Sequence, residues 1–235
     1  IRALFSNQKL AKIRNYQAKH FSFNVDAGRC EVCKGDGEVT IEMQFMADVH
    51  LECDACHGKR FKKEILEVTF ADKTIDDILN LTIDDAASFF TENLAGKIAQ
   101  KLKPLQDVGL GYVTLGQSSS TLSGGEAQRI KLASFLVKGT TKDKALFIFD
   151  EPTTGLHFHD IKKLLGSFNA LIEKGHSIIV IEHNIELIKC ADYIIDLGLE
   201  GGIKGGNIIF QGTPEELIKN KISITAPYLK NKKPS

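Results

Sequence analysis

Two closely spaced pairs of cysteines constrain the fold of this chain more than any other feature. Each pair has the form C-x2-C, and nineteen residues separate the two pairs. The four residues are Cys30, Cys33, Cys53 and Cys56. This spacing is typical of a tetrahedral Zn2+ site with four thiolate ligands. Because four protein ligands close the coordination shell, the pattern predicts a structural zinc site and not a catalytic one.

The surroundings of these cysteines support the same interpretation. Disulfide bonds are the alternative, but the cytoplasm keeps thiols reduced, and two adjacent pairs suit one metal ion better than two bridges. His50 and His57 are the rival ligands, and the symmetric cysteine pairs make them unnecessary. Cys190, near the end of an expected helix, is predicted to be a small buried hydrophobic side chain.

Composition and charge narrow the class of protein. The 235 residues are 43% hydrophobic and 26% charged, which suits one large or two small globular domains. Thirty basic and thirty acidic residues give no net charge, so overall charge predicts neither nucleic-acid nor membrane binding. Residues 1–25 and 219–235 are locally basic and contain no acid, which would allow contact with phosphates.

No part of the sequence indicates a membrane partner. No apolar run reaches the ~20 residues that a membrane helix needs, and no signal-peptide pattern opens the chain. We therefore expect a soluble cytoplasmic protein. The chain begins with Ile1 in the middle of a pattern, which suggests a piece of a longer protein.

The periodicity of apolar residues predicts an α/β protein. Alternation across residues 38–52 indicates a two-stranded hairpin, and residues 64–70 suggest a further strand. Residues 73–110 have a helical pattern, with acids in the first turn after Thr74 and after Thr82. In the last third, short apolar strands alternate with helices, which predicts a mostly parallel sheet of buried strands covered by helices. These strands are expected at residues 145–150, 177–182, 193–198 and 206–212.

The stretch "TLSGGEAQRIKLASFL", residues 121–136, predicts a helix with an unusual beginning. Glycine is a poor helix former, so two glycines in the first turn suggest that something approaches the backbone closely. Ser123 and Glu126 can form a capping box. Gly124 and Gly125 leave the first amides of the helix bare, and these amides attract anions such as phosphate. An ordinary capped helix is the alternative interpretation.

Two apolar strands end in residues that suit nucleotide hydrolysis. "ALFIFDEPTTGLH" places Asp150 where a carboxylate holds Mg2+ in many nucleotide hydrolases, and Glu151 could polarise the attacking water. "SIIVIEHN" ends in Glu182 and His183, which a parallel neighbour would bring to the same edge of the sheet. Each residue alone could be an ordinary solvated strand end, but together they favour a phosphate site.

The motifs "LSGGEAQR", "FIFDEPTTGLH" and "VIEHN", in this order, resemble the signature motif, Walker B strand, D-loop and switch histidine of ATP-binding-cassette (ABC) ATPases. The four-cysteine module directly ahead of them, "LGQSSSTLSGGEAQRIKLA" and "DLGLEGGIKGGNIIFQGTPEEL" are similar to the C-terminal part of the UvrA family. That family comprises the damage-recognition ATPases of bacterial nucleotide excision repair. The resemblance covers about residues 21–230.

The resemblance implies cofactors, partners and residue roles. The family binds ATP with Mg2+, carries structural Zn2+, and works on damaged double-stranded DNA as part of the excision nuclease system and the SOS response. Its partners are UvrB, a second copy of itself and the domain parts that carry Walker A. The resemblance implies that the γ-phosphate clamp consists of Ser123, Gly124, Gly125 and Glu126. It also implies that Asp150 is the magnesium-side acid, Glu151 the catalytic base and His183 the γ-phosphate sensor. The cysteines form the family's zinc hairpin, which is implicated in handling DNA.

The resemblance also divides the chain and exposes two departures. The expected parts are a basic lead-in at residues 1–27 and a zinc hairpin module at residues 28–72. A helical signature subdomain is expected at residues 73–140, and the Walker B and switch-histidine part of the ATPase core at residues 141–235. The chain has no G-x-x-x-x-G-K-[ST] loop, so it would carry half of each of two composite ATP sites and hydrolyse negligible ATP alone. The second departure is Leu199, where the family usually has proline.

Three other interpretations remain open. A zinc module of the DnaJ type fits "CxxCxGxG", but the second pair breaks the pattern with "CHGKR". ATPases of chromosome maintenance and double-strand-break repair share the signature and Walker B motifs, but they carry long heptad arms, which this sequence lacks. A UvrA paralogue that serves drug resistance would differ mainly in an insertion outside this chain.

Overall fold

The computed structural model describes residues 1–41, 43, 48–137, 144–200, 202 and 205–230. The chain divides into two units, which are described separately. The first unit comprises residues 1–106 and 110–122, and the second comprises residues 107–109 and 123–235. The predicted four-part division stays a prediction, and its boundary at residues 140 and 141 lies outside the described residues.

Short helices form most of the first unit. Its elements are α1 (Arg2–Ser6), α2 (Lys9–Ile13), η1 (Ala18–Phe21), β1 (Glu38–Ile41), β2 (Val49–Glu52), α3 (Lys63–Leu66), α4 (Ile75–Leu79), α5 (Ile83–Glu92), α6 (Gly96–Asp107) and η2 (Ser119–Thr121). The side chains of Thr74 and Thr82 accept hydrogen bonds from amides in the first turns of α4 and α5, so both predicted helix starts are confirmed. The core contains Phe5, Phe61 and Phe90, each at most 2% exposed.

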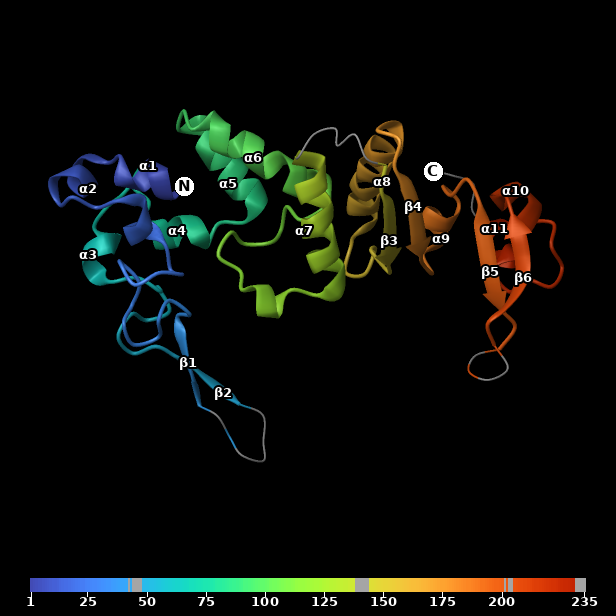
Figure 1. Ribbon diagram of the computed structural model, residues 1–235, viewed down its shortest axis with the longest axis horizontal. Coiled ribbons are helices and arrows are strands. Elements are labelled where there is room, and N and C mark those ends of the chain that lie inside the picture. The colour runs from blue at the N-terminus through green and yellow to red at the C-terminus, as the bar shows by residue number, and fades with distance from the viewer. Residues whose placement is uncertain (42, 44–47, 138–143, 201, 203–204, 231–235) are drawn as a thin grey trace. The chain divides into compact units, whose positions relative to one another are not determined.

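The predicted hairpin is present and protrudes from the first unit (Figure 1). Strands β1 and β2 pair antiparallel, from Glu38 opposite Glu52 to Ile41 opposite Val49. Every residue of both strands is exposed, so neither face of the hairpin packs on a core of its own. The predicted hairpin also includes residues 42 and 44–47, which lie outside the described residues.

The second unit contains the expected alternation of strands and helices. Its elements are α7 (Gly124–Val137), β3 (Leu146–Asp150), α8 (Phe158–Glu173), β4 (Ser177–Ile181), α9 (Ile185–Ile188), β5 (Ile194–Gly198), β6 (Asn207–Gly212), α10 (Pro214–Leu217) and α11 (Ala226–Lys230). Strands β3 and β4 pair in parallel, and β5 pairs antiparallel with β6. These elements confirm an α/β lobe, in which β3 and β4 form a parallel strand pair.

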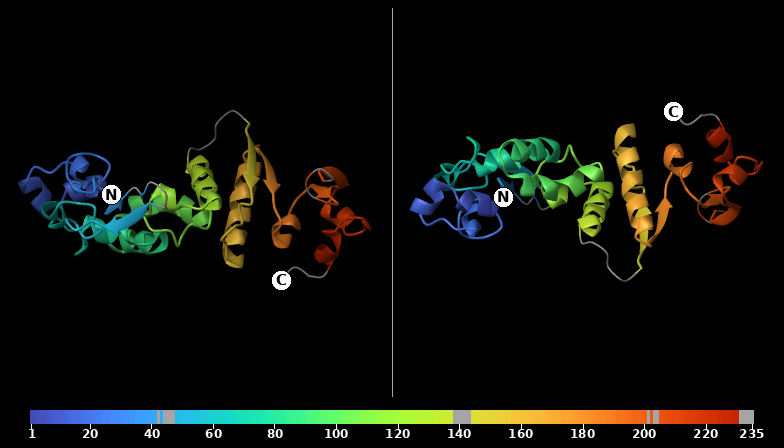
Figure 2. Two further views of the ribbon diagram at one scale, coloured as in Figure 1. Left: turned by 90° about the horizontal axis from the view of Figure 1, so that it is seen from below. Right: turned by 90° about the horizontal axis from the view of Figure 1, so that it is seen from above.

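Helix α8 covers one face of the β3–β4 pair (Figure 2). The ring of Phe149 on β3 lies 4.9 Å from the ring of Phe168 on α8, and both side chains are buried. The opposite face keeps Ile148, Ile179 and Ile181 at least half exposed. We expected buried strands, but in the described residues these two strands are covered on one face only, so their burial alternates.

Two local predictions are wrong. Residues 64–70 do not form a strand: α3 ends at Leu66, and Phe70 forms an isolated bridge with Lys73. Ile65 and Val68 are both buried and lie three residues apart, which is the spacing of a helical turn and not of a strand. Cys190 is exposed, and its thiol donates a hydrogen bond to the carbonyl of Glu186 just after the short helix α9. None of the described helices is both long and apolar enough to cross a membrane.

Candidate functional sites

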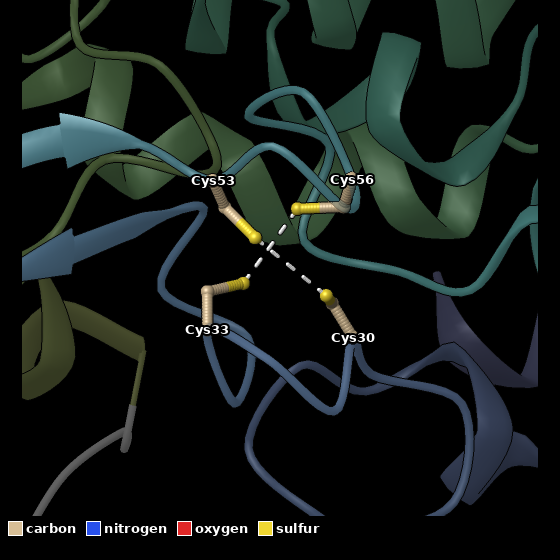
Figure 3. A group of neighbouring side chains, drawn as sticks. All are labelled: Cys30, Cys33, Cys53 and Cys56. Atoms are coloured by element: carbon tan, nitrogen blue, oxygen red, sulfur yellow. Dashed lines mark hydrogen bonds between the residues drawn. The ribbon is translucent and has the colours of Figure 1, made fainter.

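The four cysteines converge on a single point in the first unit (Figure 3). Their Sγ atoms all lie within 4.8 Å of one another, and all four residues are buried. The Sγ atoms of Cys30 and Cys53 are 3.9 Å apart, and those of Cys33 and Cys56 are 3.6 Å apart. A tetrahedron with Zn–S bonds of about 2.3 Å has edges of roughly 3.8 Å. The ligand set, the burial and the distances therefore fit one Zn2+ ion.

Tight turns around the cluster bring backbone amides to the sulfur atoms. The amide of Gly37 donates to Cys33 Sγ at 3.3 Å, and the carbonyl of Gly37 accepts from the amide of Cys53. Gly37 has a φ of +83°, and a Cβ there would lie 2.8 Å from the carbonyl oxygen of Gly58. The turn thus requires glycine for its conformation and for the close approach of a second turn. Such amide donors stabilise thiolate ligands.

The thiols differ in acidity. Burial raises the pKa of Cys56 to about 12. Burial also raises the pKa of Cys53, but hydrogen bonds from the amides of Cys56 and Ala55 outweigh this effect and lower it to about 7. Metal binding requires thiolates, so a bound cation would stabilise the charged form of Cys56 that burial disfavours.

The two rival histidines are turned toward acids of the hairpin. His50 Nδ1 lies 3.2 Å from Thr40 Oγ1 and 3.3 Å from Glu38 Oε1, and His57 Nδ1 lies 3.9 Å from Glu52 Oε1. Among the described residues, the four cysteines are the one group of at least three potential ligands close enough to share a metal ion. The four cysteines alone can therefore supply four ligands, and their assignment as zinc ligands stays a prediction.

Helix α7 in the second unit begins with the predicted capping box. The amide of Glu126 donates to Ser123 Oγ at 3.3 Å, and the amide of Ser123 donates to Glu126 Oε2 at 2.8 Å. This reciprocal pair satisfies two backbone donors and fixes where the helix starts. The capping box predicted from the sequence is confirmed.

The two glycines of α7 have different surroundings. Gly124 is exposed, and a Cβ there would meet nothing within 4 Å. Gly125 is buried, and a Cβ there would lie 3.1 Å from Arg129 Nη1 and 3.4 Å from the carbonyl oxygen of Thr154. At Gly125, the groups that approach the backbone closely therefore belong to this chain itself. Gly124 leaves open space at the helix N-terminus.

The parallel register brings the ends of β3 and β4 together. Asp150 pairs with Ile181, and the amide of Glu151 donates to the carbonyl of Ile181 at 2.9 Å. His183 Nε2 lies 3.5 Å from Glu151 Oε1, and both side chains are more than half exposed. The expectation that His183 reaches the same sheet edge as the acids is confirmed. Glu151 has a φ of +44°, an unfavourable conformation that glycine adopts more easily.

Sequence reasoning missed the residues that join α7 to the loop after β3. Arg129 is fully buried, and its Nη1 donates to the carbonyls of Pro152 at 2.7 Å and Thr154 at 3.3 Å. The amide of Asp150 donates to Gln128 Oε1 at 3.3 Å. One signal was available: Arg129 lies on the same helix face as the buried Leu132, three residues later, where a surface arginine is not expected.

Comparisons with known proteins find similar chains. UvrABC system protein A of Clostridium acetobutylicum is 58% identical over 230 residues, which is 98% of this chain and 24% of that protein. UvrABC system protein A of Staphylococcus aureus is 56% identical with the same coverage. The crystal structure of UvrA2 from Deinococcus radiodurans matches with a TM-score of 0.82 and 43% identity, over 97% of this chain and 28% of that one. No family model matches the chain.

Proposed function

This chain belongs to the UvrA family, and we propose on that premise that it is part of a DNA-damage-recognition ATPase of nucleotide excision repair. It spans about a quarter of the length of the curated relatives that it matches. The proposed activity is therefore that of a longer protein. This chain contributes the zinc module, the signature helix α7 and the edge of the β3–β4 pair.

The observation that carries the proposal is the pair of Glu151 and His183 at the ends of two parallel strands, with 3.5 Å between Oε1 and Nε2. In this role the Glu151 carboxylate accepts a proton from the attacking water, and the His183 imidazole contacts the γ-phosphate. Asp150, at the end of β3, holds the Mg2+ that accompanies ATP.

The start of α7 serves a second nucleotide. Ser123, Gly124, Gly125 and Glu126 present the open N-terminus of this helix to the γ-phosphate of ATP held by another domain. The open space at Gly124 supports this role, since a Cβ there would meet nothing within 4 Å. The chain thus supplies half of each of two composite sites, and domain parts with a Walker A loop supply the remainder.

The zinc module completes the proposal. Cys30, Cys33, Cys53 and Cys56 hold one structural Zn2+, which fixes the base of the β1–β2 hairpin. We propose that the full protein binds damaged double-stranded DNA, dimerises with a second copy, loads UvrB and acts in the cytoplasm. Excision repair is preferred to a resistance role because the curated relatives that match at 58% and 56% identity are named UvrABC system protein A.

ATP hydrolysis by the full-length protein that carries this sequence tests the proposal. The Glu151→Gln variant should bind ATP normally and lose at least about 100-fold in kcat, because it lacks the proton acceptor. Glu173→Gln, which changes an exposed acid at the end of α8, is the matched control and should hydrolyse ATP like the wild type. Wild-type turnover in the Glu151→Gln variant would refute the assignment. The 235-residue chain alone should show negligible hydrolysis.

A further inference from the structure

Glu182, at the end of β4, has contacts that the proposed catalytic roles do not explain. Its Oε1 accepts hydrogen bonds from the amide of Thr153, at 2.8 Å, and from the Thr153 hydroxyl. Thr153 lies in the loop after β3, two residues beyond Glu151. One oxygen of this carboxylate therefore holds the loop that carries the proposed catalytic base.

The second oxygen of Glu182 holds the other loop. Oε2 accepts from the amides of His183 at 2.9 Å and Asn184 at 3.1 Å. Asn184 in turn caps α9, since its Oδ1 accepts from the amide of Glu186 at 3.0 Å. The carboxylate is thus shared between the loop of Glu151 and the loop of His183.

The environment of Glu182 favours the charged form of the carboxylate. The side chain is half-buried, and burial alone would raise its pKa. Hydrogen bonds from Thr153, Asn184 and His183 outweigh burial and lower the pKa below its ordinary value of 4.5. At neutral pH the group is an anion that accepts four hydrogen bonds, and hydrogen bonds to an ionised acceptor are about twice as strong as neutral ones.

The pair at the sheet edge depends on both loops. Glu151 is held at a φ of +44°, and such a conformation persists only when its surroundings determine it. Arg129 fixes the Glu151 loop from the α7 side, through the carbonyls of Pro152 and Thr154, but it does not reach the His183 loop through these bonds. Glu182 bonds to both loops.

We propose that Glu182 is a positioning residue that fixes the loops after β3 and β4 to each other, so that Glu151 and His183 keep the separation needed for ATP hydrolysis. This inference rests on the proposed function for its effect on turnover, while the effect on the two loops is independent of it. Glutamine in this place has one acceptor oxygen, and its NH2 group would face backbone amides, so Glu182→Gln breaks the contact to one loop while keeping nearly the same volume.

The experiment combines amide hydrogen exchange and ATP hydrolysis in the full-length protein that carries this sequence. In Glu182→Gln, peptides that contain Thr153 or the His183–Asn184 amides should exchange about tenfold faster or more. The kcat should fall by about tenfold or more with KM nearly unchanged. Asp196→Asn is the matched control, because Asp196 is also half-buried and accepts hydrogen bonds from Ser223 and Thr225. This control should change neither measurement.

The pH dependence adds a readout that loss of packing would not produce. Because the pKa of Glu182 is lowered in the fold, the two loops stay linked at neutral pH and separate only as pH falls below 4.5 and through the lowered pKa. In the wild type, the relative exchange protection of both loops should therefore persist down to about pH 4.5 and then decrease. In Glu182→Gln, the loop that loses its contact should have low protection at every pH.

The exchange and hydrolysis results test the inference about Glu182 and the proposed function separately. Unchanged exchange in both loops of Glu182→Gln would overturn the inference, and so would faster exchange with wild-type kcat. If the wild-type protein hydrolyses no ATP, the proposed function fails, and the exchange data alone then decide whether Glu182 links the loops.

Discussion

Removal of zinc should unfold one module of the first unit and leave the rest intact. In the Cys53→Ser variant a hydroxyl replaces one of the four sulfur ligands, so the closed coordination shell is lost. The cluster of buried residues at this site consists of the four cysteines alone. The adjoining hairpin is exposed along both strands and adds no core of its own.

The magnitude follows from this structure. A structural zinc site contributes about 10–16 kcal/mol at pH 7 to folding. Burial of four small thiol side chains contributes far less, on the order of 1 kcal/mol each. Loss of the zinc therefore removes as much free energy as the whole stability of a typical domain, about 5–15 kcal/mol. By contrast, Ile75 and Phe90 lie outside the module and are at most 1% exposed, so the core around them should persist.

Two assays on the same samples test this prediction. Metal analysis of chelator-washed protein should find one zinc per wild-type chain and none in Cys53→Ser. Amide exchange in the variant should become fast in residues 28–41 and 48–60, and remain slow in α4 and α5. Cys190→Ser is the matched control, because that thiol is exposed and outside the cluster, so zinc content and exchange should not change. A full complement of zinc in Cys53→Ser, or slow exchange in the zinc-free module, would refute the reasoning.

Further substitutions in α7 test how the helix is built. Gly124→Ala should leave the Tm unchanged or raise it, because the added Cβ meets open space. The free energy of unfolding should rise by up to about 1 kcal/mol. Gly125→Ala should be less stable than Gly124→Ala by about 1 kcal/mol or more, since its Cβ presses on Arg129; equal Tm values would contradict this. Arg129→Met should cost about 2 kcal/mol or more in urea unfolding, because the carbonyls of Pro152 and Thr154 lose their donor. An unchanged urea midpoint would show that these buried hydrogen bonds contribute nothing.

Local chemistry explains which features the sequence predicts well. The capping box needs only Ser123 and Glu126, three residues apart, and the helix itself brings them together. The zinc ligands are similar, because each C-x2-C pair forms its own turn and the metal requires the two pairs to meet. Alternation located the hairpin because, in the part that the structure describes, its two strands form a two-stranded sheet with each other.

Contacts between distant segments explain what the sequence missed. Residues 64–70 have the β-branched and aromatic composition of a strand, but Ile65 and Val68 face the core of the first unit and impose a helical turn. The bond from Thr153 to Glu182 joins segments 29 residues apart, so it appears only when β3 and β4 are aligned. The close packing around Gly125 likewise depends on the position of Arg129 against the loop after β3.

The structure of the full-length protein that carries this sequence, solved with a non-hydrolysable ATP analogue, tests the central claim most directly. We expect two kinds of contact: one γ-phosphate within hydrogen-bond distance of the amides at Gly124 and Gly125, and another facing Glu151 and His183. Nucleotide bound in the protein without contact to either the α7 N-terminus or the β3–β4 edge would contradict it.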